Sequence, residues 1–339
     1  MKAAIFRRGD IVVDTLPEPK PAQGQALVKV LACGICGSDL HAVKHAHRMA
    51  EFSRRVPGRM PMDLDRDVVM GHEFCCELID YGPKTDKKLK AGTRVCAMPV
   101  MLEADGLKGM SYSNTYVGGY AEQMLLAAPL MLEVPNGLST EHAALTEPLA
   151  VGVHAVEKAM LKGDEAPLVV GCGPVGLAVI AALRLKNIRP IVAADFSPKR
   201  RELAVKMGAD VVVDAAKQDP YASLAPGKRA VLFECVGVPG LIQHTMEKAP
   251  RDAKIVVVGV CMELDTIEPM FGIMKELNLQ FVLGYTPEEF ARSLRLLAEG
   301  AVDAPSLITA KVGLAGVKGA FEELGNPERH TKILVEPWR

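Results

Sequence analysis

Three short segments of the chain carry side chains that could bind a transition metal. Their candidate ligands are Cys36, His72, Glu73 and Glu147. A thiolate, an imidazole and one or two carboxylates can hold zinc through three ligands and leave the fourth position open, as a catalytic zinc requires. Each segment alone is a weak signal, since a single histidine is more often structural. Together the segments predict a catalytic metal site.

Cys33 and Cys36 form a C-x-x-C spacing, which is also typical of half a four-cysteine zinc site or of a redox pair. The zinc interpretation needs a second C-x-x-C, which the chain lacks; Cys75 and Cys76 are adjacent and would point to opposite faces of a strand. The redox interpretation needs a βαβ context, whereas Cys33 follows a strand in a β-rich segment. We therefore do not expect Cys33 and Cys36 to act together as a C-x-x-C pair.

A glycine motif indicates a second chemistry. The stretch Gly171–Gly176 fits G-x-G-x-x-G between a predicted strand and a predicted helix, and Asp195 ends the next predicted strand. Backbone N–H groups at such a helix start bind a pyrophosphate, and the acidic residue binds ribose hydroxyls. The motif predicts a dinucleotide site whose turn contains Gly171, Gly173, Pro174, Val175 and Gly176.

A glycine-rich turn without a ligand, and an Asp195 that only caps a strand, are the alternative interpretations. A carboxylate at Asp195 would repel a 2′-phosphate, which favours NAD over NADP. The basic run Lys199–Arg201 follows closely. Its members could be solvated helix residues, or one of them, taken here as Arg200, could line the adenosine site.

The elements that must position these residues change type along the chain. Short β-rich runs dominate about the first 150 residues, with a helical turn and loop expected over residues 46–70 and a loop over 101–116. Helical spacing begins near Thr140, with Ser139 or Thr140 as the N-cap. From Pro167 strands and helices alternate, which predicts a parallel sheet covered by helices.

Composition limits the classes of function. A chain of 339 residues with 49% apolar residues is long enough for two domains. The net charge of -1 gives no electrostatic support for a nucleic-acid or anionic-membrane partner. No apolar run approaches the roughly 20 residues that a spanning helix needs. The N-terminus is a poor signal peptide, and the eight cysteines are not expected to form disulfides. We expect a soluble cytoplasmic protein.

In combination and in order, these motifs resemble those of the zinc-containing medium-chain dehydrogenases. The resemblance runs from the first strand to the final KILVEP, and the segment around Glu147 is similar to the sorbitol, threonine and butanediol dehydrogenase branch. It implies an α/β fold in two parts. A GroES-like β-rich catalytic domain would take residues 1–150 and 285–339, and a Rossmann doubly wound domain would take 151–284.

The resemblance also implies roles at the metal. Cys36 and His72 correspond to an invariant ligand pair, and Glu147 to a third ligand, direct or through water. Glu73 corresponds to a second carboxylate that can coordinate or swing away. Asp39 would orient the histidine ligand. Cys33 falls at a position that is not a ligand.

Further residues follow from the same resemblance. Ser38 and His41 would relay the proton of the alcohol to solvent through the cofactor ribose, whereas His45 and His47 are expected to be surface residues. The backbone after two later strands would line the nicotinamide; its residues are Cys235, Val236, Gly259 and Val260.

One departure concerns the lobe that holds a second, structural zinc in many relatives. The corresponding segment, from Arg94 to Gly118, contains only Cys96. We therefore expect one catalytic zinc per chain and no structural zinc. A homodimer or homotetramer is expected by resemblance.

The predicted reaction is hydride transfer between NAD(H) and an alcohol/ketone pair: a secondary alcohol, diol or polyol. Substrate-pocket walls are expected from residues 43–62, 100–116 and near 270–290. The alternatives are a zinc-free quinone or enone reductase of the same superfamily and, more distantly, a crystallin-like protein without activity.

Overall fold

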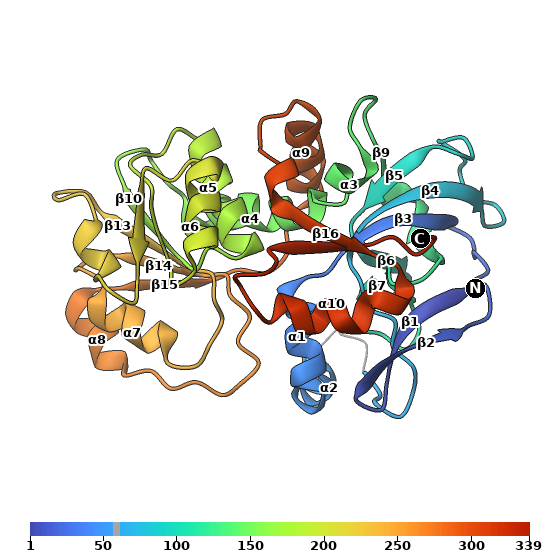
Figure 1. Cartoon of the computed structure of the whole chain (residues 1–339), viewed down its shortest axis with the longest axis horizontal. Coiled ribbons are helices and arrows are strands. Elements are labelled where there is room, and N and C mark those ends of the chain that lie inside the picture. Colours follow the sequence, from blue (N-terminus) through green and yellow to red (C-terminus); the bar gives the residue numbers. More distant parts are fainter. Residues whose placement is uncertain (57–61) are drawn as a thin grey trace.

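Two large β-sheets organise the computed structural model, which describes residues 1–56 and 62–339. Figure 1 shows a β-rich half on the right and a half with a helix-covered sheet on the left. This α/β arrangement confirms the predicted fold class. No described helix has the length and apolar character that crossing a membrane takes.

The β-rich half is built on a seven-stranded sheet in the order β16-β17-β3-β4-β5-β9, with β8 also paired to β3. In β3 the burial of side chains alternates, as expected for a strand with one face on the core. The last strand pairs with β3, so the C-terminal segment returns to this half. The strands are β3 (Gln25–Gly34), β4 (Glu73–Tyr81), β5 (Arg94–Ala97), β8 (Gln123–Ala127), β9 (Met131–Glu133), β16 (Ile308–Val312) and β17 (Lys332–Val335).

The other half is a six-stranded parallel sheet in the order β12-β11-β10-β13-β14-β15. The strand order reverses beside β10, and ligands bind at such a point, outside the carboxyl ends of the strands. The strands are β10 (Ala166–Val170), β11 (Val192–Asp195), β12 (Val211–Asp214), β13 (Ala230–Glu234), β14 (Lys254–Val257) and β15 (Asn278–Phe281). The helices are α5 (Pro174–Leu185), α6 (Pro198–Met207), α7 (Leu241–Lys248) and α8 (Pro269–Lys275).

Three helices lie between the two sheets (Figure 1): α3 (Thr140–Ala143), α4 (Thr146–Ala159) and α9 (Pro287–Ala298). The Ser139 hydroxyl accepts a hydrogen bond from the His142 amide at 3.2 Å, so Ser139 is the N-cap of α3. A Cβ atom on Gly152 would lie 2.5 Å from the Ala178 carbonyl carbon. This glycine therefore lets α4 pack closely against α5.

Several elements differ from the expectations. Residues 37–44 form a helix, α1 (Gly37–Lys44), where only strands were expected, and α2 (Ala46–Arg55) is longer than a helical turn. The remainder of that expected turn and loop includes residues 57–61, which lie outside the described residues. The expected loop over 101–116 contains a hairpin of β6 (Val100–Glu103) and β7 (Gly106–Gly109). Its Gly106 has a φ of 122°, which a side chain would disfavour.

The remaining elements lie outside the two large sheets, and one of them, the 3-10 segment Pro220–Ser223, packs against β11 and β12 of the parallel sheet. The two N-terminal strands lie in runs that were expected to be β-rich, whereas the helix before the last strand and four short 3-10 segments were not singled out from the sequence. They are β1 (Lys2–Arg7), β2 (Asp10–Thr15), α10 (Val317–Leu324), and the segments Ala128–Leu130, Pro220–Ser223, Pro305–Leu307 and Leu314–Gly316.

Candidate active site

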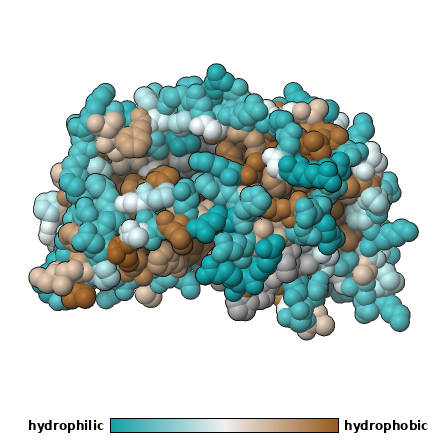
Figure 2. All heavy atoms as spheres, turned by 90° about the horizontal axis from the view of Figure 1, so that it is seen from below, coloured by the Kyte–Doolittle hydropathy of each residue, from teal (hydrophilic) through white to brown (hydrophobic). Residues whose placement is uncertain are grey.

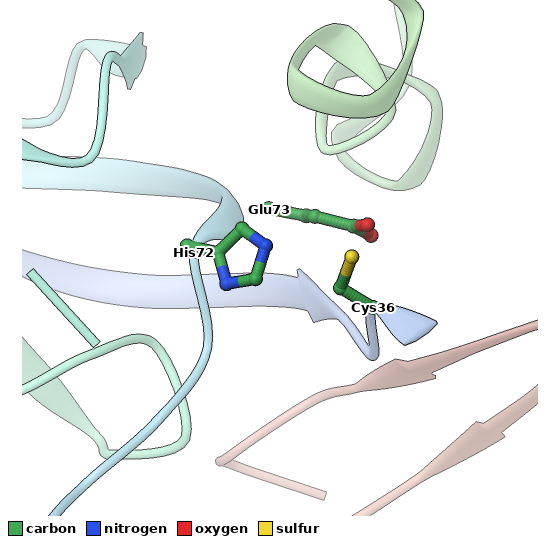
Figure 3. A group of neighbouring side chains, drawn as sticks. All are labelled: Cys36, His72 and Glu73. Carbon is green, nitrogen blue, oxygen red and sulfur yellow. The ribbon is translucent and has the colours of Figure 1, made fainter. Parts of the chain in front are cut away.

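Cys36, His72 and Glu73 each offer one ligand atom, and these three atoms lie within 4.8 Å of one another (Figure 3). Cys36 is the N-cap of α1, just beyond the end of β3, and Glu73 begins β4. The antiparallel register pairs Gly34 with Glu73, which brings the two segments together. A Cβ atom at Gly34 would lie 2.0 Å from a Glu73 carboxylate oxygen, so this position needs glycine.

The Glu73 carboxylate is fully buried and is held by Lys332 of the last strand. The Lys332 Nζ lies 2.7 Å and 2.6 Å from the two carboxylate oxygens and also donates to the Ile35 carbonyl at 3.0 Å. A buried carboxylate needs such a partner, because an unpaired buried charge is costly. Lys332 was missed from the sequence, although a lysine that opens an otherwise apolar strand was a usable signal.

Glu147 lies in the first turn of α4 and lines the same cavity as the three residues, but it is not part of their 4.8 Å group. Burial raises the pKa of Glu147 to about 7; His72 opposes this shift and the Glu73 charge adds to it. A nearby cation would stabilise this carboxylate. The donor set of a thiol, an imidazole and buried carboxyls therefore fits zinc.

Asp39 is buried beside His72, with its Oδ1 3.5 Å from the His72 Nδ1. Ser111 Oγ also lies 3.5 Å from this nitrogen. Figure 3 shows the other ring nitrogen of His72 pointing toward Cys36 and Glu73. Asp39 thus lies where an orienting residue must lie, on the side of the imidazole away from the cluster.

Asp39 is in turn fixed by three donors. The hydroxyl of Tyr120 donates to it at 2.6 Å, the hydroxyl of Tyr112 at 2.7 Å and the amide of Cys36 at 3.1 Å. The two tyrosines were missed, and they lie far from Asp39 in the sequence. Their carboxylate partner therefore could not be read from spacing.

The two predicted relay residues lie on α1 and line the cavity. Ser38 Oγ lies 3.1 Å from Cys36 Sγ and 2.9 Å from the Tyr112 hydroxyl. The His41 ring is half-buried and stacks on His45, with 6.4 Å between ring centroids. Burial, with His45 and Lys44 nearby, lowers the pKa of His41.

The cavity has a volume of about 670 Å³ and is lined from both halves of the molecule. One wall carries the metal-site and relay residues. The opposite wall carries part of the predicted cofactor site, namely Gly173, Pro174, Val175, Cys235, Val236, Gly259 and Val260. The fold thus brings the predicted metal site and part of the predicted cofactor site to one cavity.

The other predicted cofactor residues build the glycine turn beyond this cavity. Gly171 has a φ of 90°, and a Cβ atom on Gly176 would lie 1.9 Å from the Gly171 carbonyl oxygen. The Asp195 carboxylate accepts from the amides of Cys172 at 2.7 Å and Ser197 at 2.8 Å. Arg200 Nη1 lies 3.9 Å from the same carboxylate. The expected acidic residue and basic neighbour thus lie together at the end of β11.

Glu234 is a further residue that was missed. Its buried carboxylate accepts from the amides of Val236 at 2.7 Å and Gly237 at 2.8 Å, which fixes the loop after β13. A Cβ atom on Gly259 would lie 2.3 Å from the Gly237 amide, so the two loops touch through their backbones. An acidic residue at the end of an apolar strand was the available signal.

Two known protein families match this chain, one in each half of the molecule. The alcohol dehydrogenase GroES-like domain matches residues 22–136, and the zinc-binding dehydrogenase domain matches residues 174–299. The (R,R)-butanediol dehydrogenase of Bacillus subtilis (strain 168) is 32% identical over 99% of this chain and 100% of its own length. A sorbitol dehydrogenase of that strain is 27% identical over 100% of this chain and 98% of its own length.

A crystal structure of 2R,3R-butanediol dehydrogenase from Bacillus subtilis superimposes with a TM-score of 0.82 at 30% identity, over 99% of both chains. The chain therefore belongs to the zinc-binding alcohol dehydrogenases with a GroES-like domain. Within this family it falls in the branch of the sorbitol and butanediol dehydrogenases, as its motifs predicted.

Proposed function

We propose that this protein oxidises a small secondary alcohol with a neighbouring hydroxyl group, a vicinal diol, with zinc and NAD. The observation that carries the proposal is the single cavity shared by the Cys36–His72–Glu73 cluster and the loops after β13 and β14. Apolar side chains form much of the remaining wall, including Met49, Phe52, Met262 and Leu264. This favours a short alkyl diol over a hexitol. The butanediol dehydrogenase similarity supports the same substrate class.

Cys36, His72 and Glu147 would hold the zinc, with Glu73 retained beside Lys332. When bound, zinc supplies a Lewis acid for the alcohol oxygen, and NAD supplies the hydride acceptor. Ser38 Oγ would accept a hydrogen bond from the alcohol, and Ser38 and His41 line the path by which the alcohol proton would reach solvent. The apolar wall excludes water from the reacting carbon.

The decisive experiment is a panel of vicinal diols, secondary alcohols and hexitols, assayed with NAD and with NADP by the absorbance of the reduced cofactor. Butane-2,3-diol with NAD should give the highest kcat/KM. Metal analysis should find about one zinc per chain. Active protein that is essentially free of zinc would favour the quinone or enone reductase alternative.

The variant Cys36→Ser tests the metal assignment. It should lower kcat by roughly 1,000-fold or more, because the Lewis acid is lost, while NADH binding is retained.

The variant Asp195→Ala tests the cofactor assignment and should reduce the preference for NAD over NADP. Turnover by Cys36→Ser at the parent rate, or an unchanged preference in Asp195→Ala, would count against these assignments.

We also propose that the chain forms a homo-oligomer through the open edge of the parallel sheet. The strand β15 ends that sheet, and exposed apolar side chains lie on it and on the preceding helix α8. Met270 is 62% exposed, Ile273 69% and Phe281 62%. In Figure 2, brown side chains lie on the left part of the molecule, the side of this sheet, as well as on the right. An open edge strand with an apolar surround favours pairing with a second copy.

A cytoplasmic location is proposed on the state of the cysteines. All eight are free thiols in the part of the chain that the structure describes, as a reducing compartment favours. Thiol titration of denatured protein kept without reductant should find no disulfide.

A further inference from the structure

The segment that replaces the cysteine-rich lobe of many relatives places a tyrosine hydroxyl in the candidate active site. Tyr112 lines the cavity, and its hydroxyl lies 2.7 Å from Asp39 Oδ1 and 2.9 Å from Ser38 Oγ. Its ring lies against the His72 imidazole, with 5.7 Å between centroids and 58° between planes. One side chain thus contacts a predicted ligand, its orienting acid and a relay residue.

The local backbone holds this side chain in place. Ser111 is buried with a φ of 76°, a left-handed conformation that a serine adopts at a cost. The Tyr112 amide donates to the Met110 carbonyl at 3.0 Å, so the chain doubles back at Ser111. Asn114 anchors the following residues by donating to the Asp63 carbonyl at 2.9 Å. A strained and anchored turn is the expected support for a functional side chain.

The direction of the hydrogen bonds follows from counting protons. The Asp39 carboxylate accepts from the hydroxyls of Tyr112 and Tyr120 and from the amide of Cys36. The Tyr112 hydroxyl therefore donates its one proton to Asp39, and toward Ser38 it can act only as an acceptor. The Ser38 hydroxyl also has one proton, and both of its neighbours, Tyr112 and the Cys36 sulfur, act as acceptors. The Ser38 oxygen keeps its lone pairs for a donor in the cavity.

We propose that Tyr112 is a positioning residue that orients the Ser38 hydroxyl to accept a hydrogen bond from the substrate alcohol. The inference rests on the proposed function, because it assigns that alcohol as the donor. Asp39 sets the direction of Tyr112, and Tyr112 sets the direction of Ser38. Without the Tyr112 hydroxyl, the Cys36 sulfur is the acceptor that remains for the Ser38 proton among the residues that the structure describes.

The test uses the protein with Co²⁺ in place of zinc and measures the thiolate-to-cobalt charge-transfer band. In Tyr112→Phe the Ser38 hydroxyl should donate fully to the Cys36 sulfur, which weakens the sulfur as an electron donor and shifts the band to higher energy. The shift should vanish in the Ser38→Ala/Tyr112→Phe double variant. Tyr116→Phe is the matched control, because its hydroxyl binds Glu103 outside the cavity.

Activity provides a second readout. Tyr112→Phe should lower kcat roughly 10-fold, with unchanged KM for NAD, full metal content and a larger solvent isotope effect. A Tyr112→Phe protein with the parent charge-transfer band and kcat would overturn the proposal. Loss of metal from this variant alone would also overturn it, since Tyr112 would then serve metal retention. If no alcohol of the panel is oxidised by the parent protein, the proposed function fails, while the cobalt band still tests Tyr112.

Discussion

Glu73 shows how one side chain can have two competing partners. The sequence predicts it as a carboxylate that coordinates or swings away, and the structure adds a lysine bound to both of its oxygens. The pair is almost completely buried, with 2% of the Lys332 side chain and 0% of the Glu73 side chain exposed. If Glu73 moved toward a metal, the buried Lys332 ammonium would lose its carboxylate partner. Among the described residues, the Ile35 carbonyl is the Lys332 partner that would remain.

A double-mutant cycle tests this pairing. Lys332→Met should lower the free energy of unfolding by about 3 kcal/mol, because it leaves the Glu73 charge buried without its partner. Adding Glu73→Gln should restore much of that loss, since no unpaired charge remains. Urea unfolding of the two single variants and the double variant measures the coupling. Additive effects of the two substitutions would contradict a direct buried pair.

At the scale of elements, an ion pair joins the helix α3 to the C-terminal strands. Lys311 of β16 contacts Glu141 of α3 and lies 3.2 Å from Glu336, just after β17. The hydrogen bond from Lys311 lowers the pKa of Glu141 to about 2. The contact between Lys311 and Glu141 joins residues 170 positions apart and fixes the segment that leads into α4 and Glu147.

This pKa shift predicts a pH dependence of stability. The folded-state pKa of Glu141 lies below its ordinary value of 4.5, so the contribution is complete above that pH and is lost as the pH falls toward 2. Glu141→Gln should therefore lower stability at pH 7 by about 1–2 kcal/mol, after allowance for partial exposure, and should flatten the acid side of the stability curve.

Urea unfolding between pH 7 and pH 3 measures the difference between Glu141→Gln and the parent. Glu18→Gln is the matched control, because Glu18 is exposed on the loop between β2 and β3. Parallel curves for Glu141→Gln and the parent protein would show that the ion pair contributes nothing.

At the scale of the whole molecule, the proposed assembly makes the apolar surface on α8 and β15 an interface. Ile273→Glu/Phe281→Glu should yield monomers, because a carboxylate buried in an apolar interface without a partner is costly. Light scattering after size-exclusion chromatography gives the mass. Val205→Glu on α6, where Val205 is 54% exposed, is the control and should keep the parent mass. A double variant with the parent mass would refute this interface.

Local pattern was sufficient for the turn after β10 and for most of the parallel sheet. Gly171, Gly173 and Gly176 carry their own geometric requirement, and apolar runs of strand length mark buried strands. A helical turn was expected where α2 lies, but not its full length, and the hairpin β6–β7 was expected as a loop, because glycines and charged residues in its segment are typical of loops. Their form depends on what they pack against.

The sequence by itself determined the kinds of chemistry present: a thiol, an imidazole and carboxyls for a metal, and a glycine turn for a dinucleotide. Those signals are local, since each depends on residue type and short spacing. Only the tertiary structure decided that Glu73 pairs with Lys332, that Tyr112 contacts Ser38 and Asp39, and that the two sites share one cavity. Contacts between such distant residues arise from strand register and domain packing, which no single segment specifies.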